Sequence, residues 1–430
     1  MLRVRSIAIE PAKFIRSLFP AAINTAALPL AAFVASLFLL FLAPASAFSG
    51  ALPEDRAALA RIERLAANEA VNVGKATVLG PFNDTARRFD LHLTGPRSRN
   101  YSLKMNWAPD RGRALFVGAN HGKPHRLNDV WEFDLAAMSW ILLYAPDNPR
   151  SYDGLGEDAS DVVFQDGLLM SRRGGPAVIG HTWWGTTYDP VRRQLLFMNI
   201  WMTKQDEAIR QLGGDPATRY KGPPLWAFDP AAGRWQAIKT SPPGPGSPYG
   251  AMLEYVPPLG GAVWHMNNWQ MRGTWLFDPD ARRWKRLPVN REHGDFGAQA
   301  PTRELVGYYD PGRKLIIAHQ EKKTFHFDVA HKEWKRVRTE PPESSSVPRG
   351  HDARTAFYHD PVSGLGLLID FEQRRLWSYD PDRIEWTRLE PSGDPMPRGD
   401  RMLAYIDPIR NVLVIVDDAS VWAYRFRLSN

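Results

Sequence analysis

Residues 275–284 read WLFDPDARRW, and the chain repeats this stretch with variations. Trp275 and Phe277 are two positions apart, so both side chains project from the same side of an extended strand. Asp278-Pro279 then ends that strand, because proline has no amide hydrogen for a neighbouring strand and Asp-Pro favours a turn. Trp284 begins the next strand. The stretch therefore predicts two strands joined by a tight turn.

This pair of aromatic residues, nine positions apart, occurs five times, and a truncated sixth copy lies near the end of the chain. From the second copy onwards the first aromatics follow one another at steps of 49, 50, 52 and 45 residues. A period near 50 residues is typical of a propeller blade or a solenoid unit. The first step is 95 residues without a further copy, so we interpret it as one blade with insertions. The copies begin at Trp131, Trp226, Trp275, Phe325, Trp377 and Trp422.

A second pair of strands precedes each copy. In residues 309–317 and 406–415, for example, an Asp-Pro turn separates two apolar runs. Each unit then has four strands, called a, b, c and d in chain order, and four-stranded sheets repeated around an axis make a β-propeller. The predicted fold is all-β, a six-bladed β-propeller of four-stranded blades. Ten of the 16 tryptophans occupy the repeat positions, and we expect them to fill the wedges between blades.

The N-terminal part of the propeller is expected to close the ring. The last unit lacks its fourth strand, and residues 72–81 read as a strand that would supply it and remove a sheet edge. Apolar residues recur at helical spacing within residues 53–69, which predicts a short helix beside the propeller. The expected organisation is a helical segment at residues 48–71 followed by the propeller at residues 72–430.

Residues 1–47 read as a secretory signal peptide. Four basic residues and one acidic residue precede an apolar run of 14 residues, Leu30–Ala43, and Ala45-Ser46-Ala47 is a small-residue cleavage site. The run is shorter than the roughly 18 residues of a membrane span. We therefore expect an exported protein, periplasmic or extracellular, with no membrane attachment after cleavage. The alternative is an uncleaved anchor, since a looser apolar stretch begins near Ala21.

Composition excludes several classes of protein. The chain has no cysteine, so disulfides, lipoprotein attachment and thiol chemistry are excluded. The whole chain has 54 basic and 47 acidic residues. Without the leader, 50 and 46 remain, a net charge of +4 that gives little support to nucleic-acid binding. Phosphate-binding loops, dinucleotide fingerprints, zinc-protease motifs and nucleophile elbows are all missing from the sequence, so no cofactor is predicted.

Over residues 72–427 the chain resembles the kelch-type propellers of the galactose-oxidase-like class. The resemblance is carried by the paired aromatics, the Asp-Pro turns and Pro348-Arg349-Gly350-His351 at the start of a blade. The double glycine usual at the end of the second kelch strand is missing. Galactose oxidase implies a copper site with a tyrosine–cysteine crosslink, which a chain without cysteine cannot form. The resemblance therefore implies the fold and no catalytic residue.

Loop lengths indicate which face of the propeller has a function. Strands alternate in direction, so the b–c and d–a connections emerge on one face, and the short a–b and c–d turns on the other. The long connections, residues 118–129, 145–179, 203–222 and 288–301, all belong to the first kind, and variable loops on a rigid scaffold usually bind ligands. Within them we expect a hairpin about Asp166-Gly167 and a helical turn at Gln205–Leu212, together forming a lid over the central opening.

Polar and aromatic residues at the strand ends of this face are the candidate site. Histidine could act as the base, and arginine as the cation, in cleavage of an acidic polysaccharide. Histidines from different blades could also meet at a metal ion, although no pair has ligand spacing on one strand, and we predict no metal. Candidate catalytic residues are His181, His265, His351, Arg349 and Arg354. Candidate ligand-binding residues are Trp201, Asn267, Trp269, His319, Asp370, Arg398 and Asp400.

Each candidate residue also has an ordinary structural interpretation. Backbone groups can satisfy His181 and His351, Trp264 can pack between blades, and exposed charges can pair with one another. The sequence favours a binder of a small polar ligand or glycan. One alternative is a carbohydrate-active lyase or hydrolase using the histidine, arginine and acidic residues. The other is a scaffold for a protein partner.

Overall fold

A computed structural model describes residues 51–97, 99, 101–118, 126–150, 153–198, 203–245, 249–267, 272–288, 299–342, 347–399 and 402–427. All of them belong to one unit, Ala45–Asn430. The proposed signal peptide lies outside these ranges, as do the candidate residues Trp201, Trp269 and Asp400. In the described part of the chain, no helix has the length and apolar character needed to cross a membrane.

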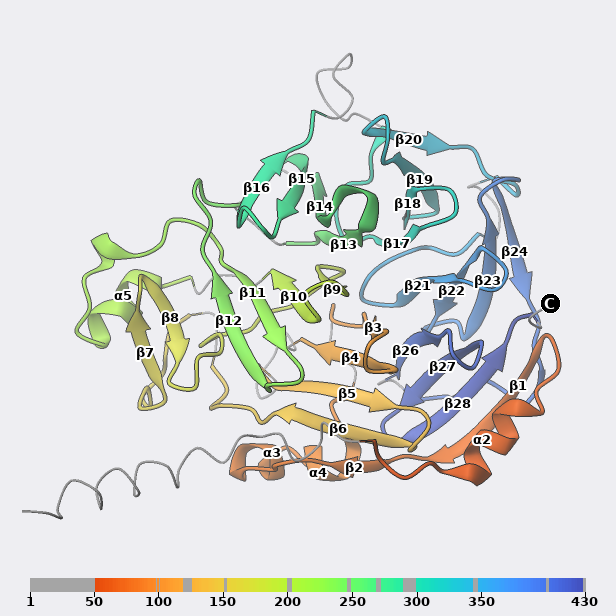
Figure 1. Cartoon of the computed structure of the whole chain (residues 1–430), viewed down its shortest axis with the longest axis horizontal. Helices are drawn as coiled ribbons and strands as arrows, with labels where there is room; N and C mark the ends of the chain where they lie inside the picture. Colours follow the sequence, from red (N-terminus) through yellow and green to blue (C-terminus); the bar gives the residue numbers. More distant parts are fainter. Residues whose placement is uncertain are drawn as a thin grey trace, which may run out of the picture. The chain divides into compact units, whose positions relative to one another are not determined.

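Six antiparallel sheets surround a central axis and form a six-bladed β-propeller, as predicted (Figure 1). The innermost strand of each blade contacts the innermost strands of both neighbours, so the ring is closed. Blades 1 to 3 contain β3 (Asn106–Ala108), β4 (Arg113–Val117), β5 (Val130–Asp134), β6 (Ser139–Tyr144), β9 (Thr186–Asp189), β10 (Gln194–Met198), β11 (Leu225–Asp229), β12 (Arg234–Ile238), β13 (Met252–Val256), β14 (Gly261–Asn267), β15 (Arg272–Asp278) and β16 (Arg283–Arg286). Blades 4 to 6 contain β17 (Val306–Asp310), β18 (Leu315–Gln320), β19 (Lys323–Asp328), β20 (Glu333–Val337), β21 (Thr355–Asp360), β22 (Leu365–Asp370), β23 (Arg375–Asp380), β24 (Glu385–Leu389), β26 (Met402–Asp407), β27 (Val412–Asp417) and β28 (Ser420–Arg425).

The N-terminal segment closes the ring, but its strand begins earlier than predicted. β1 (Glu69–Lys75) pairs antiparallel with β28 and completes blade 6, and β25 (Ser392–Gly393) pairs beside it. The rest of the predicted strand turns away, because β2 (Thr77–Leu79) pairs parallel with β6 at the outer edge of blade 1. The segment therefore joins the last blade to the first, and an unpaired edge is covered in each.

Short helices accompany these strands. The helix predicted at residues 53–69 is shorter, α2 (Arg56–Glu63), and the side chain of Asp55 caps it by accepting the Ala58 amide at 3.0 Å. α3 (Asp84–Arg88) and α4 (Leu91–Thr94) follow β2. The predicted hairpin is β7 (Val162–Gln165) and β8 (Leu168–Ser171), and the predicted helical turn is α5 (Gln205–Gln211). Single 3₁₀ turns are η2 (Pro216–Thr218) and η3 (Pro257–Leu259).

One side of the propeller, here called the turn face, consists of the a–b and c–d turns. At most of these turns an aspartate ends a strand and its carboxylate accepts backbone amides two and three residues later, which explains the repeated Asp-Pro signature. The Asp189 carboxylate, for example, accepts the amides of Val191 at 2.9 Å and Arg192 at 3.0 Å. The same two contacts are made by Asp229, Asp278, Asp328, Asp380 and Asp407. The amide three residues later is accepted by Asp134, Asp310 and Asp360.

Two arginines of the turn face join neighbouring blades. Arg313 follows the Asp310-Pro311 turn of blade 4, pairs with Asp310 at 2.8 Å, and reaches Asp382 in the c–d turn of blade 5. Arg192 of blade 2 makes the equivalent pair of contacts, to Asp189 and to Asp280 of blade 3. The charged residues of the repeat on this face are therefore used to hold turns and blades together.

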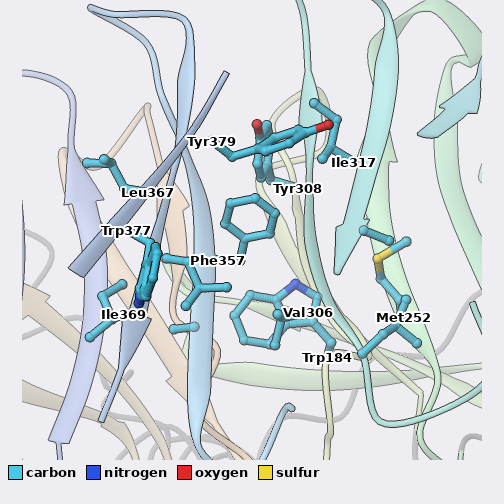
Figure 2. Close-up of a cluster of buried hydrophobic side chains, with 14 of the residues drawn as sticks. Trp184, Met252, Val306, Tyr308, Ile317, Phe357, Leu367, Ile369, Trp377 and Tyr379 are labelled. Carbon is cyan, nitrogen blue, oxygen red and sulfur yellow. The ribbon is translucent and has the colours of Figure 1, made fainter. Parts of the chain in front are cut away.

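Aromatic residues of the repeat fill the space between blades, as predicted. Nine of the ten repeat tryptophans are buried, and Trp275 is partly buried. Figure 2 shows part of the largest cluster, in which Trp184, Tyr308 and Phe357 pack together with Trp377. Trp264, expected between blades, is fully buried in such a cluster.

Side chains also fill the central channel. The Lys104 ammonium from blade 1 pairs with the carboxylate of Glu254 in blade 3 and donates to the Leu253 carbonyl at 2.9 Å. The Trp184 ring lies 5.3 Å from the same ammonium and donates to the Gly307 carbonyl at 2.5 Å. Burial lowers the pKa of Lys104 below its usual value. These side chains therefore fill the channel and form a floor beneath the opposite side of the propeller. We call that side, where the b–c and d–a connections lie, the loop face.

Candidate functional site

Residues that lead into the innermost strands of five blades meet at the loop face. Tyr101 precedes β3, His181 precedes β9, Tyr249 precedes β13, Glu304 precedes β17, and His351 precedes β21. Asp352 follows His351 directly. We call these six residues the axial cluster. Propeller symmetry explains the meeting, because each innermost strand starts at the same end of the axis.

Ring contacts connect the cluster across the blades. Tyr101 lies 5.1 Å from the His181 ring and 5.8 Å from the His351 ring, measured between ring centroids. His181 contacts Trp183 at 5.5 Å, and Trp183 contacts Tyr249 at 5.0 Å. The His181 and Trp183 side chains are buried. Tyr101 is therefore held between histidines of blades 2 and 5, which sequence spacing could not show.

His351 is flanked by two carboxylates. Its Nε2 is 3.4 Å from the Glu304 carboxylate, and its Nδ1 is 3.5 Å from the Asp352 carboxylate. The Ala353 amide donates to Nδ1 at 3.2 Å, so Nδ1 is an acceptor and the neutral ring has its proton on Nε2, towards Glu304. Burial lowers the pKa of His351, while the Glu304 carboxylate acts in the opposite direction. This arrangement is typical of a group that exchanges a proton.

Asp352 is a buried acid beneath that histidine. Its side chain is 0% exposed, and neither of its carboxylate oxygens has a hydrogen-bond partner among the described residues. Burial raises the pKa of Asp352 well above its ordinary value, with the nearby Glu304 carboxylate adding to the effect. Burial therefore favours the neutral form of this carboxyl group, the form that can donate a proton.

Three residues at the cluster have left-handed backbone conformations. The φ angles of Tyr101, Trp183 and Glu304 are 56°, 48° and 57°. Bulky residues seldom adopt this region, which costs roughly 1–2 kcal/mol per residue relative to a helical or extended backbone. Such strain collects at binding and catalytic sites, where packing holds side chains in a required position.

His265 and His319, expected at the site, instead hold blades together. The Nε2–H of His265 donates to the Pro301 carbonyl at 3.1 Å, while its Nδ1 accepts the Thr274 hydroxyl at 2.9 Å. Trp334 of the next blade donates to that hydroxyl at 3.1 Å. Burial lowers the pKa of His265 to about 4, so its ring is neutral. One blade further on, the same arrangement contains His319, Thr324, Trp386 and Pro348.

The other candidate residues fall into three groups. Arg349 and Arg354 lie at the rim and pair with Glu321 and Glu372, each at 2.7 to 2.8 Å. Asp370 is buried and caps its own b–c turn by accepting the Gln373 amide at 2.9 Å, which gives it a structural role. Asn267 is buried at the end of β14, and its backbone N–H donates to the Thr302 carbonyl at 3.2 Å. Arg398 lines a cavity beside the axial cluster.

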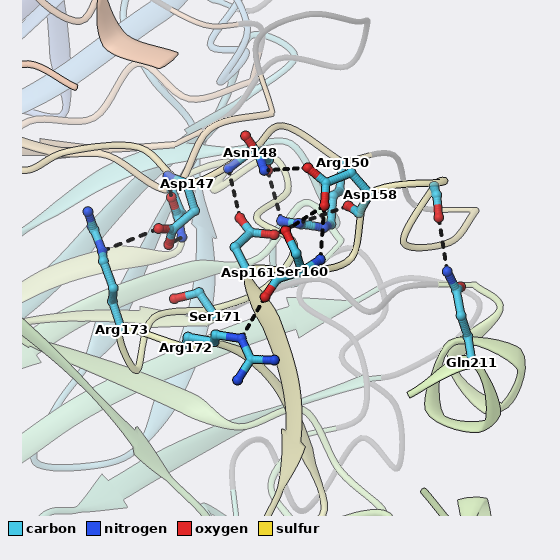
Figure 3. Close-up of polar contacts among 12 residues, drawn as sticks. Asp147, Asn148, Arg150, Asp158, Ser160, Asp161, Ser171, Arg172, Arg173 and Gln211 are labelled. Carbon is cyan, nitrogen blue, oxygen red and sulfur yellow. Dashed lines mark hydrogen bonds and ion pairs between the residues drawn. The ribbon is translucent and has the colours of Figure 1, made fainter. Parts of the chain in front are cut away.

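The long insertions of blade 2 form a separate lobe. Figure 3 shows its polar contacts, in which Arg150 pairs with Asp161, and Gln211 donates to the Gly156 carbonyl at 3.0 Å. Figure 1 places its elements β7, β8 and α5 beside the outer strands of blade 2, and Lys239 of that blade donates to the Asp166 carbonyl at 2.6 Å. The expected lid over the central opening is therefore wrong. We call this part the rim lobe.

Sequence reasoning did not select Tyr101, Tyr249 or Asp352. A signal for them exists, because each precedes an innermost strand. For Tyr101 that signal is weak, because the first strand of blade 1 is short and no Asp-Pro turn separates it from β4. Among the described residues, no group of three or more histidine and acidic side chains is arranged to hold a metal ion.

Comparisons with known proteins do not assign this chain to a family. A scan against protein-family models finds no match for the chain, and a search of curated proteins also finds none. The fold itself is a six-bladed β-propeller of four-stranded antiparallel sheets.

Proposed function

We propose that this protein binds a small polar ligand, such as a glycan, at the axial cluster of the loop face. Two aromatic rings and several hydrogen-bonding groups lie together in this cluster, a combination that suits the flat faces and hydroxyls of a sugar. Tyr101 and Tyr249 are partly exposed, so their rings are accessible to such a ligand.

The observation that carries this proposal is the placement of His351. Its ring lies beside the phenol of Tyr101 and between the carboxyl groups of Glu304 and Asp352. These groups lie at the mouth of the channel, which Lys104 and Trp184 close. Polar groups usually lie in such a position only where they bind something, since partly buried charge without a matched partner destabilises the folded state.

The proposal includes the kelch type of this propeller and its export. Support for the kelch type comes from the paired aromatics and Asp-Pro turns in the sequence, and support for export comes from the basic and apolar leader with its small-residue cleavage site. Under this proposal the ligand is periplasmic or extracellular.

An enzyme of carbohydrate metabolism is the second candidate, favoured by the acid–base pair in the cluster. Nδ1 of His351 is held as an acceptor by the Ala353 amide, and Asp352, 3.5 Å away, is a buried acid whose pKa is raised by burial. A base and an acid with different environments are the groups that proton transfer in a lyase or hydrolase requires. Arg354, 2.7 Å from Glu372, would supply the cation.

A ligand screen tests the proposal. The melting temperature of the purified protein is measured with glucose, galactose, cellobiose and D-glucuronate, and titration calorimetry follows for any sugar that raises it. We expect His351→Gln to weaken binding about tenfold while the protein stays folded, the size of one or two lost hydrogen bonds. His331→Gln is the control, because His331 is exposed on the turn face. The proposal fails if no sugar raises the melting temperature, or if both variants weaken binding equally.

Turnover separates the two candidates. With acidic and neutral polysaccharides as substrates, an enzyme loses activity in His351→Gln by a much larger factor than it loses affinity. A binder shows no turnover in either form.

A further inference from the structure

A cavity of about 400 Å³ opens beside the axial cluster, between blades 5, 6 and 1. Its size falls within the usual range of small-ligand pockets, about 300–1,000 Å³. Ala353 belongs to its wall and also donates its amide to His351, so the cavity adjoins the cluster. We call it the arginine pocket, because its wall contains Arg99, Arg354, Arg374 and Arg398 together with a single carboxylate, Glu372.

The positive charges of the arginine pocket are only partly compensated. Arg99 is buried and pairs with Asp129 at 2.6 Å, so its charge is satisfied within the protein. Arg374 and Arg398 have neither an ion pair nor a side-chain hydrogen bond within the described part of the chain. The wall of the pocket therefore has a net positive charge, and two of its guanidinium groups have no ion-pair partner among the residues that the structure describes.

The remaining arginine is held loosely. Arg354 donates to both oxygens of Glu372, at 2.8 and 2.7 Å, but both side chains are about half exposed. An ion pair exposed to water contributes only about 0–1 kcal/mol, so a ligand anion can replace Glu372 at low cost.

The pocket also has an apolar lining. Leu103, Phe371 and Met402 contribute to it, and Leu103 and Met402 are buried. A ligand that suits this lining has both a carboxylate and a carbon face. A uronic acid has this form, with a planar carboxylate that matches the guanidinium fork and a pyranose ring with apolar faces.

A second cavity, of about 450 Å³, lies beside the rim lobe and contains an arginine that is not available to a ligand anion. Arg150 lines it, but its guanidinium is buried, pairs with Asp161 and donates to the Asn148 carbonyl. Its wall also includes Arg88 and Arg126, together with Glu157 and Asp158, which oppose an anion. Four arginines face one carboxylate in the arginine pocket, against three arginines and two carboxylates here, so the larger excess of positive charge belongs to the arginine pocket.

We infer that the arginine pocket binds the carboxylate of a uronic acid and places the sugar ring against His351. This inference deepens the proposed function and rests on it. Arg374 and Arg398 hold the carboxylate, with Arg354 joining when it leaves Glu372. Specificity for an acidic sugar over a neutral one follows, because a neutral ligand leaves these guanidinium groups without partners.

Two probes of the same shape test the inference. Titration calorimetry compares D-glucuronate with D-glucuronamide, whose carboxamide replaces the carboxylate and removes the charge. We expect glucuronate to bind roughly 10- to 100-fold more tightly, the range for charge-assisted hydrogen bonds. In the double variant Arg374→Gln/Arg398→Gln this ratio should fall to about one, and the preference in the parent protein should shrink with added salt. Arg283→Gln, an exposed arginine on β16, is the matched control and should leave the ratio unchanged.

The outcomes separate the inference from the proposed function. Equal binding of the two probes by the parent protein overturns the inference and leaves the proposed function standing. The same holds if the double variant keeps the preference at an unchanged melting temperature. If neither probe nor any neutral sugar binds, the proposed function fails and the inference fails with it.

Discussion

The turn face and the loop face of this propeller use the same kinds of residue for different purposes. On the turn face, Asp310 accepts the Arg313 amide and pairs with its guanidinium, which in turn reaches Asp382 in the next blade. On the loop face, Asp352 is as deeply buried as Asp310 but has no hydrogen-bond partner among the described residues. A carboxylate on the turn face therefore stabilises a turn and a neighbouring blade, whereas Asp352 on the loop face is buried beside His351.

The same contrast applies to histidine. Both ring nitrogens of His265 bond to the protein in a neutral tautomer, between Thr274 and the Pro301 carbonyl. His351, by contrast, is partly exposed and lies between Glu304 and Asp352. Residue type alone thus does not identify the site; the partners of each residue do.

The largest effect is expected for Asp310→Ala on the turn face. The substitution removes the cap of its turn and the buried partner of Arg313, so the free energy of unfolding should fall by about 3 kcal/mol. Urea unfolding measures this loss. Asp382→Ala removes only the exposed partner of the same arginine, and we expect about 0.5 kcal/mol. Equal losses in the two variants would contradict the role given to the buried cap.

A smaller effect concerns the pH dependence of stability and distinguishes the structural histidine from the site. Burial lowers the pKa of His265 from 6.5 to about 4 in the folded state. Between those values the unfolded chain takes up a proton that the folded protein does not, so stability falls as the pH falls. From pH 7.5 to pH 5 this histidine should cost about 2 kcal/mol.

Urea unfolding at both pH values checks the histidine prediction, because His265→Gln should show a flatter pH dependence than the parent protein. The control is His331, whose pKa is raised by the hydrogen bond to the Asp328 carboxylate. Its contribution to stability therefore increases as the pH falls, opposite to that of His265. A parent curve no steeper than that of His265→Gln would rule out the buried, neutral histidine.

The smallest effect is expected for Glu304→Asn at the axial cluster. Glu304 has a φ of 57°, and asparagine tolerates this conformation better than glutamate. The variant should be more stable by about 0.5 kcal/mol yet bind the ligand less well, because His351 loses its carboxylate neighbour. Chemical unfolding and titration calorimetry give the two quantities. Destabilisation by 2 kcal/mol or more would make Glu304 a structural residue and place it with the turn face.

The repeat made the fold predictable from the sequence. Aromatic spacing, Asp-Pro turns and the period near 50 residues all describe local structure that every blade shares, and the six blades follow from it. The position of the closing strand was predicted only approximately. The chain turns after β1, and β2 pairs with a strand of a different blade. Pairing between distant segments depends on the completed ring and not on local pattern.

The candidate site was predictable only as a face. Arg354, His181 and His351 were selected because they start innermost strands, and the structure brings both histidines to Tyr101. His319 was expected at the same face from its place near the end of β18, but it bonds to Thr324 of its own blade and packs against Trp386 of the next blade. Whether a histidine of this face is held between blades depends on these threonine and tryptophan contacts, and only the packed structure shows them.

The central claim is that ligand binding belongs to the loop face, and hydrogen–deuterium exchange with and without D-glucuronate tests it most directly. We predict slower exchange in the segments that precede β3, β21 and β26 and in the b–c turn of blade 5, with no change in the Asp-Pro turns. Protection confined to the Asp-Pro turns or to the rim lobe would contradict this account.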